Sequence, residues 1–308
     1  MARFALARPR HPEPLPATIG RKRIFVLPTG FGLFIGAMLA TMLVGGLNYN
    51  NNPALLLVFL LAGVANNSLV HAHLILSGIT LKTVHAEPVF AGQVLRLKLR
   101  FEGSGSRRRP GLQLLAGHAQ ALFELPPGEE AETTLELVTH RRGWMELGRL
   151  RLSTLWPLGL ARSWCWLRPD NRMLVYPSPE PTAPPLPEAL GDGDSPRTRA
   201  HGEQPHHLRD YRRGDMPRQI AWKASARADK LLVREYESAV ARDLALDWSL
   251  VGGLGHEQKI SRFTRWVIEA ERSGSRYALS LPGQRIPPGC GAEHRHLCLR
   301  ALALMPDG

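Results

Sequence analysis

The chain has 308 residues, of which 44% are hydrophobic and 21% are charged, and its formal net charge is +12. This hydrophobic share excludes a wholly disordered polymer, because it is large enough to build packed cores. The three cysteines follow no regular spacing, which excludes a small disulfide-stapled fold and is typical of a reducing compartment.

The amino-terminal segment, residues 1–23, is basic: it contains six Lys or Arg residues and a single acid, Glu13. Three of these cations, Arg21, Lys22 and Arg23, directly precede a stretch without charge. A basic segment on the cytoplasmic side of a membrane is attracted to anionic lipid headgroups. We therefore expect residues 1–23 to form a basic cytoplasmic N-terminus.

Residues 24–76 are predicted to form a two-helix transmembrane hairpin. From Ile24 to Leu81 the sequence contains no Asp, Glu, Lys or Arg. A polar, Asn-rich turn that begins at Asn48 divides this stretch into two apolar arms of 24 residues each. As a helix, each arm is long enough to cross the ~30 Å hydrocarbon layer. A buried soluble hairpin is the alternative, but two consecutive uncharged arms of this length disfavour it.

The distribution of charge predicts the orientation of the hairpin. Lys and Arg near the ends of membrane spans stay on the cytoplasmic side. The cations at 21–23 precede the first arm, Lys82 follows the second, and the turn between the arms has no charge. We expect a protein of the cytoplasmic (inner) membrane with two spans, both termini in the cytoplasm and the turn outside.

Small residues recur every fourth position in the first arm, at Gly32, Gly36 and Ala40. Such a stripe is typical of a helix face that a second helix approaches closely, so we expect it to pack against the second arm. Asn66 and Asn67 are expected to form hydrogen bonds across the helix pair rather than to line a transport path.

A β-rich domain is predicted for residues 79–176. Between Leu95 and Phe101, apolar residues alternate with charged ones, which is typical of a half-buried strand. Gly and Pro turns separate several short runs of this kind, and this favours an antiparallel β-sandwich. Residues 177–196 follow as a Pro/Gly-rich linker, whose first eleven residues include six prolines.

Residues 197–308 are predicted to contain an irregular charged segment followed by a partial α/β region. Strands are expected at Leu244–Trp248 and Tyr277–Leu281, with a helix between them and a last helix at Glu293–Met305. This alternation favours parallel pairing of the strands. The 67 residues from Arg242 onward are too few for a full doubly wound sheet, so the α/β region is small or incomplete. The fold class predicted for the whole chain is membrane-anchored α+β.

The stretch from Arg197 to Arg234 contains ten cations and four acids. Within it, Gly214 permits a tight turn, and Asp215 is suited to cap a helix whose first turn contains Pro217. We expect most of these charges to pair with one another and some to remain exposed for docking to an acidic partner. Nucleic-acid binding is not expected, because no recognition motif accompanies the charge.

Residues 209–235 resemble the signature of the bacterial family catalogued as "domain of unknown function 58". That signature reads R-x-Y-x-x-G-D-x-x-R-x-I-x-W-K-x-S-A-R and then L-x-V-R-E, with Ala221 here at a position where His, Asn or Asp is common. Residues 141–160 resemble a second pattern, R-R-G … L-G … D-P-F/L-G-L, with Trp156 in place of the Asp. The resemblance includes the hairpin and covers nearly the whole chain. The signature positions, which are candidates for partner docking, are Asp210, Tyr211, Arg212, Gly214, Asp215, Arg218, Trp222, Lys223, Ser225, Arg227, Arg234 and Glu235.

The resemblance implies an anchored protein with a β-rich segment and a carboxy-terminal von Willebrand factor A-like region. Members of the family are typically encoded beside a MoxR-type AAA+ ATPase and often beside a membrane transglutaminase-like protein. These proteins are the expected partners, together with the lipid bilayer. We expect a non-enzymatic scaffold or adaptor that works with the ATPase in the assembly or maturation of envelope or other protein complexes. The sequence contains no G-x-x-x-x-G-K-[ST] loop, so ATP hydrolysis is left to the partner.

Two alternative functions stay open from the sequence. One is an envelope-associated, hydrolase-like enzyme that uses Asp210, Asp215 or a cluster of Cys and His residues. The other is a basic module that binds lipid or nucleic acid, for which binding would depend steeply on salt.

Neither a metal nor a cofactor is expected. The adhesion motif of von Willebrand factor A-like domains, Asp-x-Ser-x-Ser, supplies oxygen ligands to Mg²⁺. The corresponding residues here include Asp247 and Ser249, but the third position is Val251, which offers no oxygen. This motif is therefore degraded, and we expect Asp247 and Ser249 to satisfy nearby backbone groups.

A second candidate metal site consists of Cys290, His294, His296 and Cys298. Zinc accepts such ligands, but their spacing matches no common zinc module. A Cys–His nucleophile pair would also need a residue that orients the base, and the sequence shows none. We expect neither chemistry here.

Overall fold

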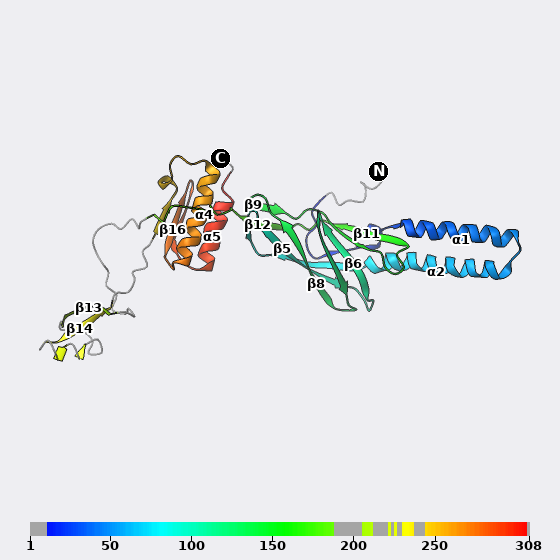
Figure 1. The fold of residues 1–308 in the computed structure, drawn as a ribbon, viewed down its shortest axis with the longest axis horizontal. Helices are drawn as coiled ribbons and strands as arrows, with labels where there is room; N and C mark the ends of the chain where they lie inside the picture. The colour runs from blue at the N-terminus through cyan, green and yellow to red at the C-terminus, as the bar shows by residue number, and fades with distance from the viewer. Residues whose placement is uncertain are drawn as a thin grey trace. The chain divides into compact units, whose positions relative to one another are not determined.

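The structure is a computed structural model that describes residues 11–187, 205–211, 221–222, 225–226, 230–236 and 244–306. The chain folds into two compact units, Met1–Ser178 and Pro179–Gly308. It is a mixed α+β protein with two apolar amino-terminal helices and several sheets, as predicted (Figure 1). The boundary between the units falls inside the predicted linker.

The two apolar helices, α1 (Gly30–Asn48) and α2 (Asn52–Leu76), pack side by side as an antiparallel hairpin (Figure 1). At ~1.5 Å per residue they are about 28 and 37 Å long. The side chain of Asn51 caps α2, because its Oδ1 accepts a hydrogen bond from the Ala54 N–H at 3.1 Å. The Asn-rich turn therefore joins two helices directly, without room for a further domain.

The first helix begins later than Ile24, where the predicted span begins. Phe25–Pro28 instead form a strand, β2, which pairs with β11 (Ala161–Leu167). Thr29 then caps α1, since its Oγ1 accepts a hydrogen bond from the Gly32 N–H at 3.0 Å. The first part of the uncharged stretch thus belongs to a sheet.

The small-residue stripe does not pack against α2, so that prediction is wrong. Gly36 and Ala40 are exposed, and a Cβ at Gly36 would meet no atom within 4 Å. The buried positions of α1 are Leu39 and Gly46, which are seven residues apart and therefore lie on one helix face. The helix pair uses this face because Gly46 gives room to the side chain of Leu55, which would lie 2.9 Å from a Cβ there.

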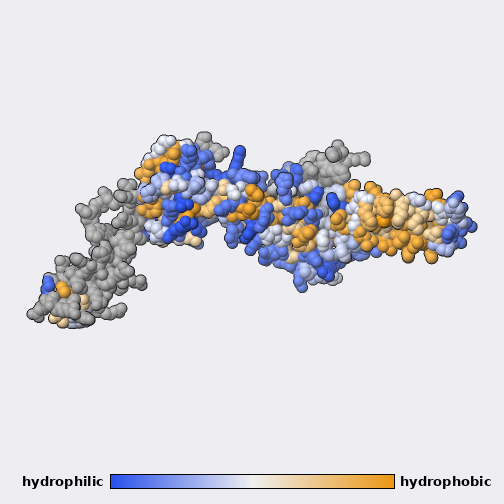
Figure 2. All heavy atoms as spheres, in the orientation of Figure 1, coloured by the Kyte–Doolittle hydropathy of each residue, from blue (hydrophilic) through white to orange (hydrophobic). Residues whose placement is uncertain are grey.

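Apart from its polar turn, the remaining surface of the hairpin is mostly apolar and exposed (Figure 2). Both helices are long and apolar enough to cross a membrane, and only 11% of the most apolar window of each is buried. A core helix of a soluble protein would be mostly buried instead. Asn66 and Asn67 are also exposed, so they do not bridge the pair as expected. Side chains that are more than half exposed include Phe31, Leu33, Phe34, Val44, Leu56, Phe59 and Leu60.

The rest of the first unit is a β domain built from three sheets, with strand orders β1-β3-β5-β8, β2-β11-β10-β6-β7 and β4-β12-β9. Its named strand pairs are antiparallel, as predicted, except for the parallel pair β4–β12. The strands not yet given are β1 (Ala17–Thr18), β3 (Ile79–Ala86), β4 (Val89–Phe90), β5 (Val94–Gly103), β6 (Arg109–Ala116), β7 (Ala119–Leu125), β8 (Glu130–Val138), β9 (Gly143–Glu146), β10 (Leu150–Thr154) and β12 (Arg172–Tyr176).

One hydrophobic core lies between the four-stranded and five-stranded sheets. The alternation predicted for β5 is confirmed, because its apolar residues from Leu95 to Phe101 are fully buried and the intervening cations are exposed. The ring of Phe101 stacks on that of Phe123 from the other sheet, with centroids 5.0 Å apart. Two sheets that share a core in this way form the expected sandwich.

The second unit contains a small α/β element. Strand β15 (Leu244–Asp247) pairs in parallel with β16 (Tyr277–Leu281), and α4 (His256–Arg272) connects them, as predicted. Strand β17 (Gln284–Gly289) is antiparallel to β16, and α5 (Ala292–Ala303) follows. A short 3₁₀ helix, η4 (Trp248–Leu250), follows β15.

Part of the predicted linker lies along α4. The carboxylate of Glu180 accepts two hydrogen bonds from Arg262, at 2.8 and 2.9 Å. The indole N–H of Trp266 donates to the Pro184 carbonyl at 2.9 Å. Over its described residues, the Pro-rich run is therefore attached to the second unit and is not a free spacer.

Candidate functional site

The joint between the hairpin and the β domain is a network of polar contacts to both helix ends. On the side of α2, the helix end is part of the hydrophobic core. Ser68, Ala72, Ile75 and Leu76 are all buried, and their spacing of three or four residues places them on one face. The last turns of α2 are thus packed into the domain, while the earlier turns project from it.

A buried arginine holds the end of α2. Arg109, at the start of β6, is 2% exposed, and its Nη1 donates to the carbonyls of Ile75 at 3.1 Å and Ser77 at 2.8 Å. Its Nη2 donates to the Ser104 carbonyl at 2.8 Å. Burial lowers the pKa of this guanidinium, and the nearby charge of Arg107 lowers it further. The cation satisfies carbonyls at the negative end of the helix, where a positive charge is favourable.

The start of α1 is fixed to the loop between β10 and β11. The Thr29 N–H donates to the Leu160 carbonyl at 2.9 Å, and its hydroxyl donates to the Gly159 carbonyl at 2.6 Å. Gly32 lies so close to the Leu160 carbonyl that a Cβ would overlap with the oxygen. Both ends of the hairpin are therefore bound directly to the β domain.

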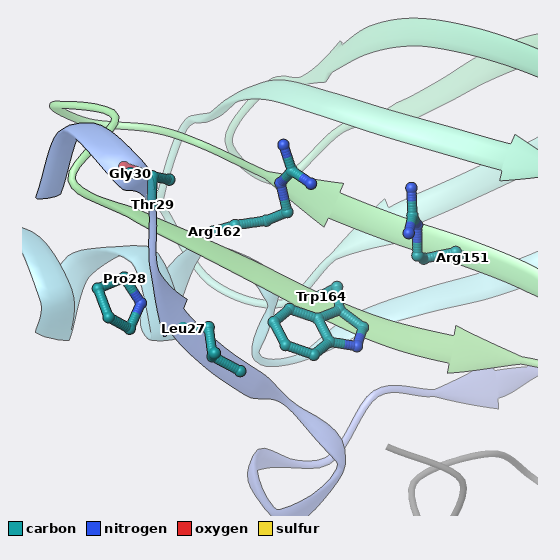
Figure 3. Close-up of a pocket in the computed structure, with 7 residues that line it drawn as sticks. All are labelled: Leu27, Pro28, Thr29, Gly30, Arg151, Arg162 and Trp164. Carbon is teal, nitrogen blue, oxygen red and sulfur yellow. The ribbon is translucent and has the colours of Figure 1, made fainter. Parts of the chain in front are cut away.

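A cavity of about 350 Å³ lies beside the start of α1 (Figure 3). In the sheet, Arg162 is the register partner of Leu27, so their side chains share one face. Figure 3 shows Arg162 and Arg151 on neighbouring strands, with Trp164 on the same strand as Arg162. The described residues that line the cavity include no acid; they are Leu27, Pro28, Thr29, Gly30, Arg151, Arg162 and Trp164.

Within the predicted basic N-terminus, the described residues 11–23 make specific contacts. Arg23 forms a bidentate ion pair with Glu13, with hydrogen bonds of 2.7 and 2.8 Å, and donates a hydrogen bond to the Trp166 carbonyl at 3.0 Å. Arg21 and Lys22 are exposed. One of the three cations that precede the hairpin thus has a structural partner, and two face solvent.

The described signature residues include a strand pair and a buried serine that is hydrogen-bonded to it. Strand β13 (Pro205–Asp210) is antiparallel to β14 (Leu232–Tyr236). Asp210 is the register partner of Leu232, whose N–H donates to the Ser225 hydroxyl at 2.8 Å. Ser225 is buried, which gives this signature position a structural role.

Two signature aromatics are accessible: Tyr211 is 37% exposed and Trp222 is 64% exposed. Strand β14 also contains Arg234 and Glu235. The other signature positions lie outside the described residues; they are Arg212, Gly214, Asp215, Arg218, Lys223 and Arg227.

Asp247 and Ser249 bond to each other at the start of η4. Asp247 Oδ1 accepts hydrogen bonds from the Ser249 N–H at 2.8 Å and from its hydroxyl at 2.7 Å. These two bonds lower the pKa of Asp247, and the charge of Arg285 lowers it further. Asp247 thus caps the 3₁₀ helix, as expected of a residue that satisfies nearby backbone.

The Cys/His cluster does not have the geometry of a nucleophile. The thiol of Cys298 lies 3.6 Å from His294 Nε2, but the same nitrogen lies 2.7 Å from the Tyr277 carbonyl. A carbonyl accepts only, so Nε2 carries a proton there and cannot take one from the thiol. Burial, followed by the charge of Glu271, raises the pKa of Cys298 to about 12. Among the described residues, no three His, Cys, Asp or Glu side chains are grouped to hold a metal.

Sequence reasoning did not identify Arg109, Arg151 or Arg162. Arg109 is the last of three consecutive arginines, and nothing local distinguishes the buried one. In β11 a signal exists, because Arg162 and Trp164 alternate with small buried residues. That alternation marks an outer face rich in arginine and tryptophan.

No protein-family model matches the chain, and no curated protein matches it. The family resemblance described above therefore stays a prediction. The geometry of the joint and of the cavity is independent of it.

Proposed function

We propose that this protein is a non-enzymatic scaffold, anchored in the cytoplasmic membrane by α1 and α2. The observation that carries the proposal is the apolar, exposed hairpin whose two ends are built into the β domain. An exposed apolar surface of this extent is unstable in water but stable in a bilayer. The backbone of each helix is satisfied internally, as a lipid environment requires.

The rigid joint supports a scaffold rather than a tethered enzyme. Thr29 binds the β10–β11 loop and Arg109 binds the end of α2, so no flexible linker separates the anchor from the domain. A domain held in this way has a fixed height and orientation at the membrane surface. At Cys165 and Cys298 thiol chemistry is also disfavoured, because both thiols are buried and burial raises the pKa of each to about 12.

The proposed orientation places both termini in the cytoplasm. Its support is the position of the charges: exposed Arg21 and Lys22 lie before α1, Lys82 lies after α2, and the turn at 49–51 is uncharged. In this orientation α1 begins and α2 ends on the cytoplasmic side. The β domain and the second unit therefore both lie in the cytoplasm.

We further propose a MoxR-type AAA+ ATPase as the partner, with a membrane transglutaminase-like protein as a second one. The support is the resemblance of residues 209–235, together with the exposure of Tyr211 and Trp222 within that segment. Exposed aromatics of this kind frequently dominate the energy of a protein interface. The von Willebrand factor A-like identity of the second unit belongs to the same proposal and is supported by the parallel pair β15–β16 around α4.

The anchor is tested by fractionation and protease protection. The full-length protein is expected in the membrane pellet after extraction at alkaline pH, and the β domain should resist protease added to intact right-side-out spheroplasts. In inverted vesicles the same protease should digest it. Recovery of the full-length protein in the soluble fraction without detergent would refute the anchor.

The partner is tested by capture of the purified ATPase on the detergent-solubilised full-length protein. Trp222→Ala should weaken capture at least about ten-fold, as expected for a large interface aromatic. The control is Trp144→Ala, because Trp144 is 47% exposed but lies in the β domain. Equal capture by the wild type and the folded Trp222→Ala variant would contradict docking through this segment.

A further inference from the structure

We propose that the cavity beside the start of α1 binds the phosphate of an anionic phospholipid headgroup. The proposal rests on the membrane anchor proposed above, since the anchor brings this cavity to the bilayer surface. It assigns to the joint a second role, which is to recognise the lipid that surrounds the anchor.

The two arginines of the cavity have unused hydrogen-bonding capacity. Within the described residues, the side chains of Arg151 and Arg162 form no hydrogen bond or ion pair, and Arg151 Nε is buried without an acceptor. A buried donor without an acceptor costs free energy, which an incoming acceptor recovers. Phosphate oxygens match the planar guanidinium better than most acceptors do, since they accept paired hydrogen bonds.

The cavity lies at the height that lipid headgroups would occupy. Leu27 and Pro28 line it and lead directly into α1, where the apolar surface begins. Trp164 also lines it, and its ring lies 5.9 Å from that of Phe25. Tryptophan is enriched where a membrane protein meets the headgroup layer, because the ring is apolar and its N–H is polar.

The apolar lining favours a lipid over free phosphate. Leu27, Pro28 and the Trp164 ring offer contact area to the glycerol and upper acyl groups, which inorganic phosphate lacks. The absence of an acid among the described lining residues makes a zwitterionic headgroup a poorer ligand, because its cation would face Arg151 and Arg162. The positive end of the α1 dipole adds a further preference for negative charge.

The experiment is a lipid titration of the detergent-solubilised full-length protein, followed by native mass spectrometry. The probes are phosphatidylglycerol and phosphatidylcholine with identical acyl chains. The wild type should bind phosphatidylglycerol more tightly than phosphatidylcholine. Arg162→Gln and Arg151→Gln should each weaken phosphatidylglycerol binding about five-fold, and the double variant about 25-fold. Binding of phosphatidylcholine should change less than two-fold.

Two further variants separate the site from general charge effects. Arg149→Gln removes an exposed arginine that precedes β10 at the strand end away from the hairpin, and it should leave lipid binding unchanged. Arg162→Lys keeps the charge and should retain more affinity than Arg162→Gln.

Three outcomes would overturn the assignment. These are equal affinity of the wild type for the two lipids, an equal loss in Arg149→Gln and Arg162→Gln, and displacement of phosphatidylglycerol by equimolar inorganic phosphate. The headgroup site and the proposed function can fail independently. If the protein is found in the membrane pellet but shows no lipid preference, only the headgroup site is refuted. A protein found in the soluble fraction refutes the anchor itself.

Discussion

At the end of α2, the guanidinium of Arg109 satisfies three carbonyls, those of Ile75, Ser77 and Ser104. Two of them belong to a helix terminus and the residue after it, which have no partner inside the helix. The third lies in the loop that precedes β6. One side chain thus joins α2 to the sheet, and its loss would leave several buried acceptors without donors.

Arg109→Ala should lower the free energy of unfolding of the first unit by about 3 kcal/mol, since buried acceptors lose a charged donor. The control is the adjacent Arg108→Ala, which breaks only an exposed ion pair with Glu124 and should cost less than about 0.5 kcal/mol. Chemical denaturation in detergent measures both. Similar losses in the two variants would show that Arg109 does not hold the joint.

Gly32→Ala and Gly36→Ala form a second matched pair. At Gly32 a Cβ overlaps with the Leu160 carbonyl, a backbone atom that cannot move aside cheaply, whereas at Gly36 the space is open. Gly32→Ala should therefore destabilise the protein by about 1–3 kcal/mol, while Gly36→Ala should be neutral or stabilising. Thermal unfolding in detergent gives the comparison. If both variants melt at the wild-type temperature, α1 is not fixed to the loop as described.

At the scale of elements, the segments with a strong local period were predictable. In β5, apolar and charged residues alternate without interruption, so the strand and its buried face follow from the sequence alone. The strand β2 was not predicted, because Phe25–Pro28 are uncharged and continuous in sequence with the apolar arm. An apolar residue suits either environment, and pairing with β11 decides between them. The small-residue stripe was predicted to be the contact face of α1, but the residues that α1 buries are Leu39 and Gly46.

The contact between the Pro-rich run and α4 should depend on pH. The hydrogen bonds from Arg262 lower the pKa of Glu180 in the folded state. A lowered carboxyl pKa contributes stability above the unfolded value of about 4.3, and this contribution is lost as the pH falls through the folded value. The ion pair should therefore hold the run at neutral pH and release it in acid.

Glu180→Gln tests this contact through hydrogen exchange of residues 179–187 in the full-length protein. At pH 6 the free energy of local opening should fall by about 1 kcal/mol. As the pH falls below the lowered pKa of Glu180, the difference between the wild type and the variant should disappear, because the wild-type carboxyl becomes protonated. Arg262→Gln should reproduce the loss at pH 6. A difference between the wild type and Glu180→Gln that stays constant with pH would contradict the ion pair.

At the scale of the whole molecule, the apolar hairpin and the β domain cannot be separated at the helix ends. Ile75 and Leu76 belong to the same core as the sandwich strands, so the hairpin is a structural part of the domain. An anchor that only tethered the domain would leave that core intact when removed.

Deletion of Gly30–Leu76 should therefore yield an aggregated protein, not a soluble β domain. A shorter deletion, of residues 36–66, keeps the first turn of α1 and the buried turns of α2 and should preserve the β-sheet signal in circular dichroism. Size-exclusion chromatography of both proteins gives the comparison. A monodisperse, folded product of the longer deletion would show that α2 contributes nothing to the core.

The sequence by itself determined the apolar helical hairpin, the strand-rich domain and the parallel α/β element, because each follows from composition or from a short-range period. The resemblance to a family adds partners that stay predictions. Only the tertiary structure decided which arginine is buried, where α1 begins and which residues form the cavity. Leu27 is far from Arg151 and Arg162 in the chain, and the pairing of β2 with β11 brings it beside them. Such long-range register depends on packing across the whole domain, which no local pattern encodes.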